Sequence, residues 1–270
     1  MFVSFSEDCI EGFFQSPPRS SSRYSLRMNS QSSPLAGNLL LGQLPPREQK
    51  QLQTHLELVS VETRQELDEV GGDVRYICFP LDCAISLMDH QPDGQSVEIA
   101  VIGKEGSTGF HAAQGLTTSP CRTIVQVGGS MYRLGARWLN ASVPFLLQSL
   151  IRFGAVIFRH TVISVGCSQF HSVDQRLGRW LLAHQHRTGL TTFPFTHEFL
   201  AEQLGVQRGT VTEALAVLQE KKLVESGYGK VKVLKSTALE KVSCDCFQLA
   251  KQAIEEYLDD IKAYKRSMAN

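Results

Sequence analysis

The sequence has no excess of charge of either sign: Lys and Arg together number 27, and so do Asp and Glu. A chain without net charge has no global field that would draw it onto nucleic acid or an acidic membrane surface. It also lacks an uninterrupted apolar run near the roughly 18 residues that a membrane-spanning helix needs. Any contact with DNA must therefore come from a local patch, and no contact with a membrane is expected.

Recognisable catalytic motifs are also missing. The segment GKEGSTG at residues 103–109 has turn glycines, but it lacks the Lys-Ser/Thr ending and the helix of a phosphate-cradling loop. There is no H-E-x-x-H pattern and no serine-elbow pattern. We therefore expect no enzyme and no catalytic residue.

The seven cysteines lack the regular spacing of a disulfide framework, and no secretory leader is apparent. This usage fits reduced thiols and a cytoplasmic protein. Cys9 is the only cysteine near the N-terminus, and Cys78 and Cys83 are five residues apart. Such spacing argues against an iron–sulfur cluster.

Cys244 and Cys246 form a C-D-C triplet. On a helix their side chains would point about 200° apart, so one metal ion could not easily take both. If the segment is not helical, a thiol switch or half of a metal site stays open beside the simpler reading of packed or surface thiols. We predict no metal site. His184 and His186 have the same spacing, and we expect both to titrate in solvent.

The chain changes in character along its length. Residues 1–36 are rich in Ser, Pro and Arg and predict a disordered leader; translation starting at Met28 is one hypothesis for it. Residues 37–140 open with a helical pattern from Leu39 to Leu58. Short β-branched segments then alternate with turn signals such as VGGD and QPDGQ, which predicts an antiparallel sandwich or barrel.

Residues 141–171 predict one long helix with an apolar seam spaced 4, 3, 4, 3, 4. The seam consists of Leu147, Ile151, Gly154, Phe158, Thr161 and Val165. A second apolar face consists of Val143, Leu146, Leu150, Ile157 and Val162. One reading is that the helix only covers the β domain. The other, which the second face favours, is that one face packs on the β domain while the seam pairs with the same helix of a second copy.

Residues 172–240 predict a winged helix-turn-helix. Ser172 and Thr196 are helix caps. Ala201, Gly205 and Val211 have the four-then-six spacing of two helices that cross at a tight turn. A hairpin with a G-Y-G turn follows directly as the wing, and residues 241–270 are a C-terminal helix or tail.

The polar residues of this region are predicted to contact DNA. Arg208 suits a bidentate contact with guanine and Gln207 one with adenine, while Glu213 either accepts from cytosine or orients Arg208. The wing lysines suit phosphates. The full set is Thr196, His197, Gln207, Arg208, Thr210, Thr212, Glu213, Lys230 and Lys232.

Four segments resemble the Crp/Fnr family of bacterial transcription regulators: FPLDCAISL, VEIAVIGKEGSTGF, HSVDQRLGRWLL and THEFLAEQLGVQRGTVTEAL. The resemblance implies an α+β protein with an N-terminal jelly-roll β-barrel of the cyclic-nucleotide-binding type, a long dimerisation helix and a C-terminal winged helix-turn-helix. It also implies a homodimer on double-stranded DNA with two half-sites, and contact with RNA polymerase if the protein activates.

The sequence departs from the family pattern at two places. Family members that bind cyclic nucleotide have a Gly-Glu pair and, further on, an Arg-Ser/Thr pair. Here Arg122 and Thr123 match the second pair, but Gly109 is followed by Phe110. A ribose would lose its acceptor, so a cyclic nucleotide is not expected and the effector is unknown. In the recognition helix, Gly209 and Glu213 replace residues of the family's best-known pattern, which predicts a different target sequence.

A second function class stays open. The protein could be a ligand-binding regulator or adaptor whose winged helix contacts protein. The polar residues Gln207, Arg208 and Thr212 at the start of the second helix favour DNA.

Overall fold

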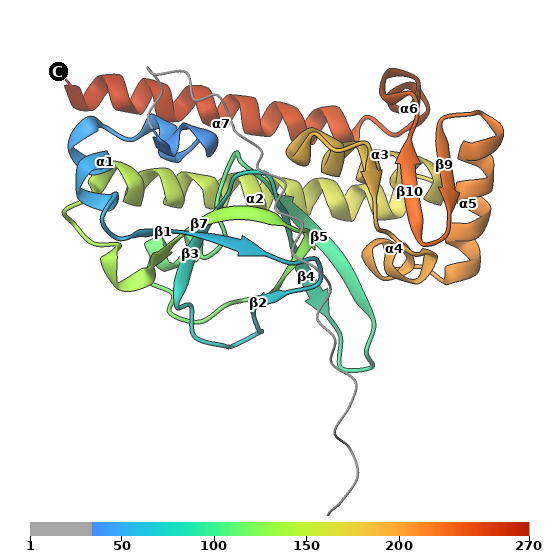
Figure 1. Ribbon diagram of the computed structural model, residues 1–270, viewed down its shortest axis with the longest axis horizontal. Helices are drawn as coiled ribbons and strands as arrows, with labels where there is room; N and C mark the ends of the chain where they lie inside the picture. Colours follow the sequence, from blue (N-terminus) through green and yellow to red (C-terminus); the bar gives the residue numbers. More distant parts are fainter. Residues whose placement is uncertain (1–33, 270) are drawn as a thin grey trace, which may run out of the picture. The chain divides into compact units, whose positions relative to one another are not determined.

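The computed structural model describes residues 34–269 (Figure 1). Residues 1–33 of the predicted leader, and with them the hypothesis about Met28, lie outside this range. Residues 34–36, which the sequence pattern assigned to the leader, belong to the short 3-10 helix η1 (Pro34–Gly37). Directly after it the buried Asn38 amide donates to the carbonyls of Pro80 and Gly106, both at 3.0 Å, and fixes this segment to the β domain.

The helix predicted from Leu39 to Leu58 is shorter in the structure. Two elements, η2 (Leu41–Gln43) and α1 (Pro46–Leu52), occupy its first part, and Pro46 takes the first helical position as expected. From Leu56 onward the chain pairs into a sheet. Partners far along the chain therefore override the local helical pattern here.

The predicted N-terminal jelly-roll domain, called the β-roll from here on, is confirmed as two antiparallel sheets. Its elements are β1 (Leu56–Val61), β2 (Glu66–Asp68), β3 (Tyr76–Pro80), β4 (Ala84–His90), β5 (Ser96–Ile102), η3 (Phe110–Gln114), β6 (Arg122–Val127), β7 (Gly129–Gly135) and η4 (Ala136–Trp138). The strand orders are β1-β7-β3 and β2-β6-β4-β5. Inward side chains such as Val61, Ile85 and Val125 fill the space between the sheets.

The long helix α2 (Pro144–Phe170) follows the β-roll and has an unusual N-terminal cap. The N-cap residue Val143 offers no side-chain acceptor. Instead, the buried Glu48 carboxylate on α1 accepts hydrogen bonds from the backbone nitrogens of Phe145, at 2.8 Å, and Leu146, at 3.0 Å. A carboxylate at this end satisfies free N–H groups and lies at the positive pole of the helix dipole.

Burial divides α2 into two sides. Val143, Leu146, Leu150 and Ile157 are buried, as predicted for the second face, whereas Val162 is 55% exposed. Five residues turn a helix about 140° beyond a full turn, so Val162 cannot share the side of Ile157. Among the described helices, α2 alone has the length and apolar composition that a membrane span requires. It packs against η3, β5 and α7, as the core helix of a folded domain does.

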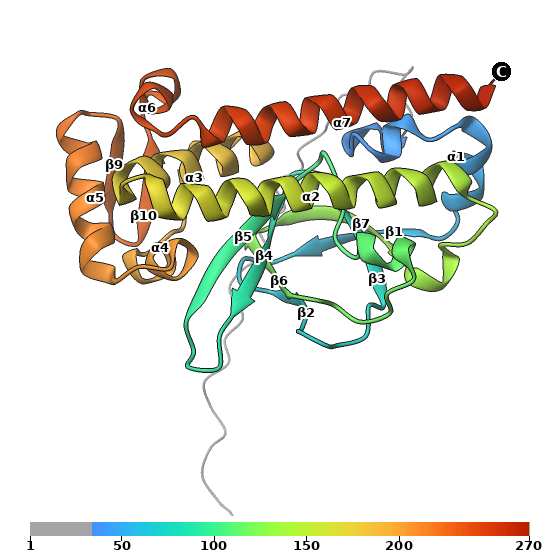
Figure 2. The same cartoon turned by 180° about the vertical axis from the view of Figure 1, so that it is seen from behind.

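The C-terminal segment forms α7 (Cys246–Ala269), which runs antiparallel along α2 (Figures 1 and 2). The Tyr257 hydroxyl donates to the Ser149 carbonyl at 3.2 Å, and Arg152 pairs with Asp260 at 2.5 Å. The C-D-C triplet is not helical throughout, because α7 begins at its last residue. The alternative of a non-helical segment therefore applies to it.

The C-terminal half contains the winged helix-turn-helix. Its elements are α3 (Val173–Thr188), β8 (Thr192–Phe193), α4 (His197–Leu204), α5 (Arg208–Glu220), β9 (Val224–Gly227), β10 (Lys230–Val233) and α6 (Ser236–Val242). The strands form a sheet of order β8-β10-β9. Trp180, Phe195 and Phe199 pack at the centre of this half, and Ala84 and Val101 of the β-roll join the same core.

The cap on α2 gives a prediction. Glu48→Ala should lower the free energy of unfolding by about 1–3 kcal/mol, because it leaves two buried N–H groups without an acceptor. Glu48→Gln keeps one acceptor and should lose less. The exposed Glu62→Ala is the control and should stay within about 0.5 kcal/mol of the wild type in urea unfolding. Equal stability of all three variants would contradict the capping role.

Candidate nucleic-acid interface

The helix-turn-helix has the local geometry that the sequence predicts. The Thr196 hydroxyl caps α4 by accepting from the backbone nitrogen of Phe199 at 3.2 Å. Gly205 ends α4 with a φ of 62°, a left-handed conformation that glycine adopts at little cost. Ala201 and Val211 are buried where the two helices cross. The four-then-six spacing is thus confirmed as the signature of this turn.

His197 connects the two helices to the wing. The Thr212 hydroxyl donates to the Arg208 carbonyl at 3.1 Å, so His197 Nδ1 donates to Thr212 Oγ1 at 2.9 Å. Nε2 of the same ring lies within hydrogen-bond distance, 3.3 Å, of the Ser226 hydroxyl on β9. His197 and Thr212 therefore fix the angle between α4, α5 and the wing. The sequence did not single out Ser226, because only the hairpin brings it close to α4.

Arg208 is held at the first position of α5 by an acidic partner. Its Nε lies 2.6 Å from Glu198 Oε1, and both side chains are more than 60% exposed. Of the two roles proposed for Glu213, orienting Arg208 is therefore filled by Glu198. Gln207 is the exposed N-cap residue of α5, and Thr210 is half-buried in its first turn. The base contacts of all these residues stay predictions.

The wing is a tight hairpin with basic side chains on its open face. Tyr228 and Gly229 form the turn with positive φ values of 51° and 71°, and Tyr228 is fully exposed at the tip. Lys230 and Lys232 alternate with buried Val231. Sequence reasoning placed the turn at G-Y-G and named both lysines, but it did not name Tyr228 among the candidate contacts.

A groove of about 430 Å³ lies between the start of α4, α5 and the wing. Five of the residues predicted to contact DNA line it: Thr196, His197, Arg208, Thr212 and Lys230. Gln207, Thr210, Glu213 and Lys232 lie outside this lining. The groove thus places cationic and hydrogen-bonding groups on one surface. Glu198 is the only acidic residue among those that line it.

The residues predicted to bind an effector have different surroundings from one another. Gly109 packs so closely on β3 that a Cβ there would lie 2.7 Å from the Tyr76 carbonyl oxygen. Arg122 donates from Nε and Nη2 to both carboxylate oxygens of Glu66 at 2.9 Å and lines a hollow beside α4. Thr123 is buried in the β-roll. Their role in effector binding stays a prediction.

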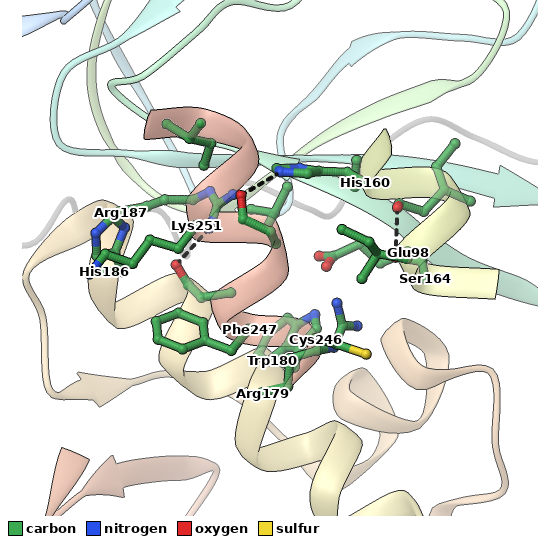
Figure 3. A pocket seen from close by; sticks show the side chains of 17 residues that line it. Glu98, His160, Ser164, Arg179, Trp180, His186, Arg187, Cys246, Phe247 and Lys251 are labelled. Carbon is green, nitrogen blue, oxygen red and sulfur yellow. Dashed lines mark hydrogen bonds between the residues drawn. The ribbon is translucent and has the colours of Figure 1, made fainter. Parts of the chain in front are cut away.

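The β-roll and α3 meet through buried polar groups around a small cavity of about 30 Å³ (Figure 3). Glu105 Oε1 on the loop after β5 pairs with Arg187 Nε at 2.9 Å, and both side chains are buried. Burial raises the pKa of the Glu98 carboxyl, to which the Ser86 hydroxyl donates. In Figure 3 the side chains of Glu98 and Arg179 both lie beside this cavity.

The expectation for one histidine is wrong. His184 is fully buried against Trp180, with ring centroids 3.7 Å apart, and burial lowers its pKa to about 3. It lies on the same helical face as the apolar residues of α3, which places it in the core rather than in solvent. His186, two residues further on, is exposed.

The predicted dimer seam lies on the open side of α2. Leu147, Ile151, Gly154 and Thr161 are partly exposed, while Phe158 and Val165 are 72% and 61% exposed. Gly154 faces its own chain, since a Cβ there would lie 2.5 Å from the Gln114 amide nitrogen of η3. The small residue therefore accommodates η3. Pairing with a second copy stays a prediction.

Comparison with known proteins agrees with this geometry. Residues 175–242, from α3 to the end of α6, match the Crp-like helix-turn-helix domain. No curated protein matches the sequence. The chain therefore contains a Crp-like helix-turn-helix domain.

Several solved structures share the fold over more than two thirds of this chain. A CRP-family transcriptional regulator of Thermus thermophilus is 17% identical with a TM-score of 0.57, over 68% of this chain and 96% of that one. A CRP/FNR-family regulator of the same organism is 19% identical, with a TM-score of 0.54 over 69% and 98%. The c-di-GMP responsive global regulator CLP of Xanthomonas campestris is 14% identical, with a TM-score of 0.56 over 68% and 96%. The fold is that of Crp/Fnr-type transcription regulators.

Gly209 gives a prediction for the first turn of α5. A Cβ at this position would meet nothing within 4 Å, so Gly209→Ala should raise the free energy of unfolding by about 0.5–1 kcal/mol. Gly205→Ala is the matched control and should be destabilising, because Gly205 has a positive φ. Urea unfolding measures both. A destabilised Gly209→Ala would mean that the start of α5 is not a regular helix.

Proposed function

We propose that the protein is a sequence-specific transcription regulator that binds double-stranded DNA as a homodimer in the cytoplasm. The observation that supports this most directly is the groove of the Crp-like domain. It combines Arg208 at the start of α5 with His197 on α4 and Lys230 on the wing. Helix N-termini of this kind enter the major groove, and wings pass along phosphates.

Arg208 is the proposed base-reading residue. It lies in the first turn of α5 with its guanidinium exposed, and Glu198 already holds Nε in an ion pair. An exposed ion pair of this type contributes only about 0.2–1 kcal/mol, so exchanging it for a guanine edge costs little. Gln207 and Glu213 would contact neighbouring bases, and Lys230 and Lys232 the phosphates.

The homodimer is proposed to form through the open side of α2. Phe158, Val162 and Val165 are each more than half exposed and lie one helical turn apart along it. Neither α7 nor the β-roll covers them. A second copy of α2 offers the complementary apolar surface, and two winged helices would then face two half-sites of an inverted repeat.

The β-roll is proposed to sense an effector other than a cyclic nucleotide. Its open hollow of about 450 Å³ is lined by the carboxylates Glu66, Asp68, Glu69 and Asp73, against the cations Arg75 and Arg133. Arg133 is itself paired with Glu57 at 2.7 Å. An anionic phosphate would meet repulsion there. If the protein activates, RNA polymerase is a further partner.

The role of Arg208 can be tested by gel shift on the promoter region of the protein's own gene, with competitor DNA. Arg208→Ala should weaken specific binding by about 1–3 kcal/mol and relax discrimination at one base pair, because the bidentate contact is lost. Arg266→Ala, an exposed arginine on α7, is the control and should bind like the wild type. Unchanged affinity and selectivity of Arg208→Ala would reject the base-reading role.

The dimer can be tested by light scattering. Phe158→Glu should give monomers with a nearly unchanged free energy of unfolding, because the side chain is 72% exposed in the single chain. Leu58→Glu, which alters a similarly exposed apolar residue on β1, should leave the mass unchanged. A dimeric Phe158→Glu protein would place the interface elsewhere.

A further inference from the structure

Three cysteines and a histidine from separate parts of the chain converge beside the end of α2. Cys167 lies in its last turn, and His171 directly follows the helix. Cys244 lies in the break between α6 and α7, and Cys246 is the first residue of α7. Their four potential ligand atoms all lie within 4.8 Å of one another. The cysteines are buried and pack with Ile163 as a separate cluster.

The distances match those of a single tetrahedral ion. Cys167 Sγ is 3.5 Å from Cys244 Sγ, and Cys246 Sγ is 3.6 Å from His171 Nδ1. With Zn–S near 2.3 Å and Zn–N near 2.0–2.1 Å, the ligand atoms of a tetrahedral zinc ion lie about 3.6–3.8 Å apart. Small side-chain rotations would bring the remaining pairs to this spacing.

The surrounding charges suit a set of thiolates. Three thiolates and a zinc ion together carry one negative charge. Arg176 and Arg179 on α3 are close enough to interact electrostatically with the cysteines. Such cations offset the charge that a site with three cysteines leaves in a buried place.

Two other uses of these thiols fit the arrangement less well. A disulfide between Cys167 and Cys244 would leave Cys246 and His171 together without a function. An iron–sulfur cluster distributes its ligands over different irons, so their sulfur atoms lie farther apart than a single ion requires. Four ligand atoms within 4.8 Å of one another indicate one ion.

We propose that Cys167, His171, Cys244 and Cys246 bind one structural Zn²⁺ ion. The site has the Cys3His ligand set of closed tetrahedral zinc sites, with no open position for a substrate. Two ligands come from the last turn of α2 and the residue that follows it. The other two come from the break before α7 and the first residue of α7. The ion would therefore tie α7 to α2 at the point where α3 begins, next to the N-cap Ser172. This inference does not depend on DNA binding.

The test uses the full chain, purified under reducing conditions, supplied with zinc and passed through a desalting column. Native mass spectrometry and elemental analysis should find one zinc ion per chain in the wild type. Cys244→Ser and Cys246→Ser should lose it. Cys121→Ser, which alters a thiol of the β-roll outside the cluster, should keep it. A wild type without zinc, or zinc retained in both cluster variants, would overturn the proposal.

Two further variants keep the test decisive if the serine variants fail to fold. His171→Cys preserves four ligands and should keep the ion. His171→Ala should weaken zinc affinity by more than the ~10–100-fold that loss of an outer-shell partner costs. With Co²⁺ in place of zinc, the wild type should show the visible absorption of a tetrahedral thiolate complex, and His171→Cys a stronger sulfur-to-cobalt band. Two other outcomes would also overturn the proposal. One is iron with sulfide in the native protein. The other is a disulfide between Cys167 and Cys244 that forms when the reduced chain, supplied with zinc, is exposed to air without having bound metal.

Discussion

The buried ion pair between Glu105 and Arg187 fixes how the two halves of the protein meet. Glu105 Oε1 accepts from Arg187 Nε at 2.9 Å and from the Gly103 nitrogen at 3.0 Å, and Arg187 Nη1 donates to the Ala183 carbonyl at 3.1 Å. A Cβ on Gly103 would lie 2.7 Å from Arg187 Cβ, so glycine is needed for this approach. Loss of either partner would leave the other charge buried and unpaired, which is strongly destabilising. The ion pair therefore holds α3 against the loop that follows β5. The positions of α4 and α5 follow from α3, against which both pack.

The same junction contains buried polar contacts beside its apolar ones. Gln126 of β6 donates to Gln203 of α4 at 2.7 Å, which adds a second specific contact between the halves. A buried polar contact of this kind is strong, and either group would be costly to leave without its partner. A junction built this way favours a few alternative arrangements over a continuous range of them. This is a suitable basis for transmitting a change in the β-roll to the winged helix, in the function proposed above.

The sequence allowed the winged helix-turn-helix to be predicted in detail, because short-range rules determine it. The Thr196 cap, the left-handed Gly205 and the buried Val211 depend on neighbours within a few turns. The features that escaped depend on partners far apart in the chain. Glu48 caps a helix 97 residues later, and Cys167 meets Cys244 at a separation of 77 residues. The four-residue spacing of Cys167 and His171, together with the C-D-C triplet, is the signal that could have revealed the cluster.

In the proposed function, the acidic partner of Arg208 would favour sequence-specific contacts with DNA over non-specific ones. Glu198 lies at the start of α4, where it pairs with the exposed guanidinium of Arg208. Contacts with phosphates alone would have to overcome this pairing and would gain nothing sequence-specific in return. A guanine edge would offer Arg208 two acceptors in the geometry of its guanidinium, and would thus replace the ion pair with a stronger contact. In that proposed role, the ion pair would weaken non-specific contacts with DNA more than the contact with the correct site.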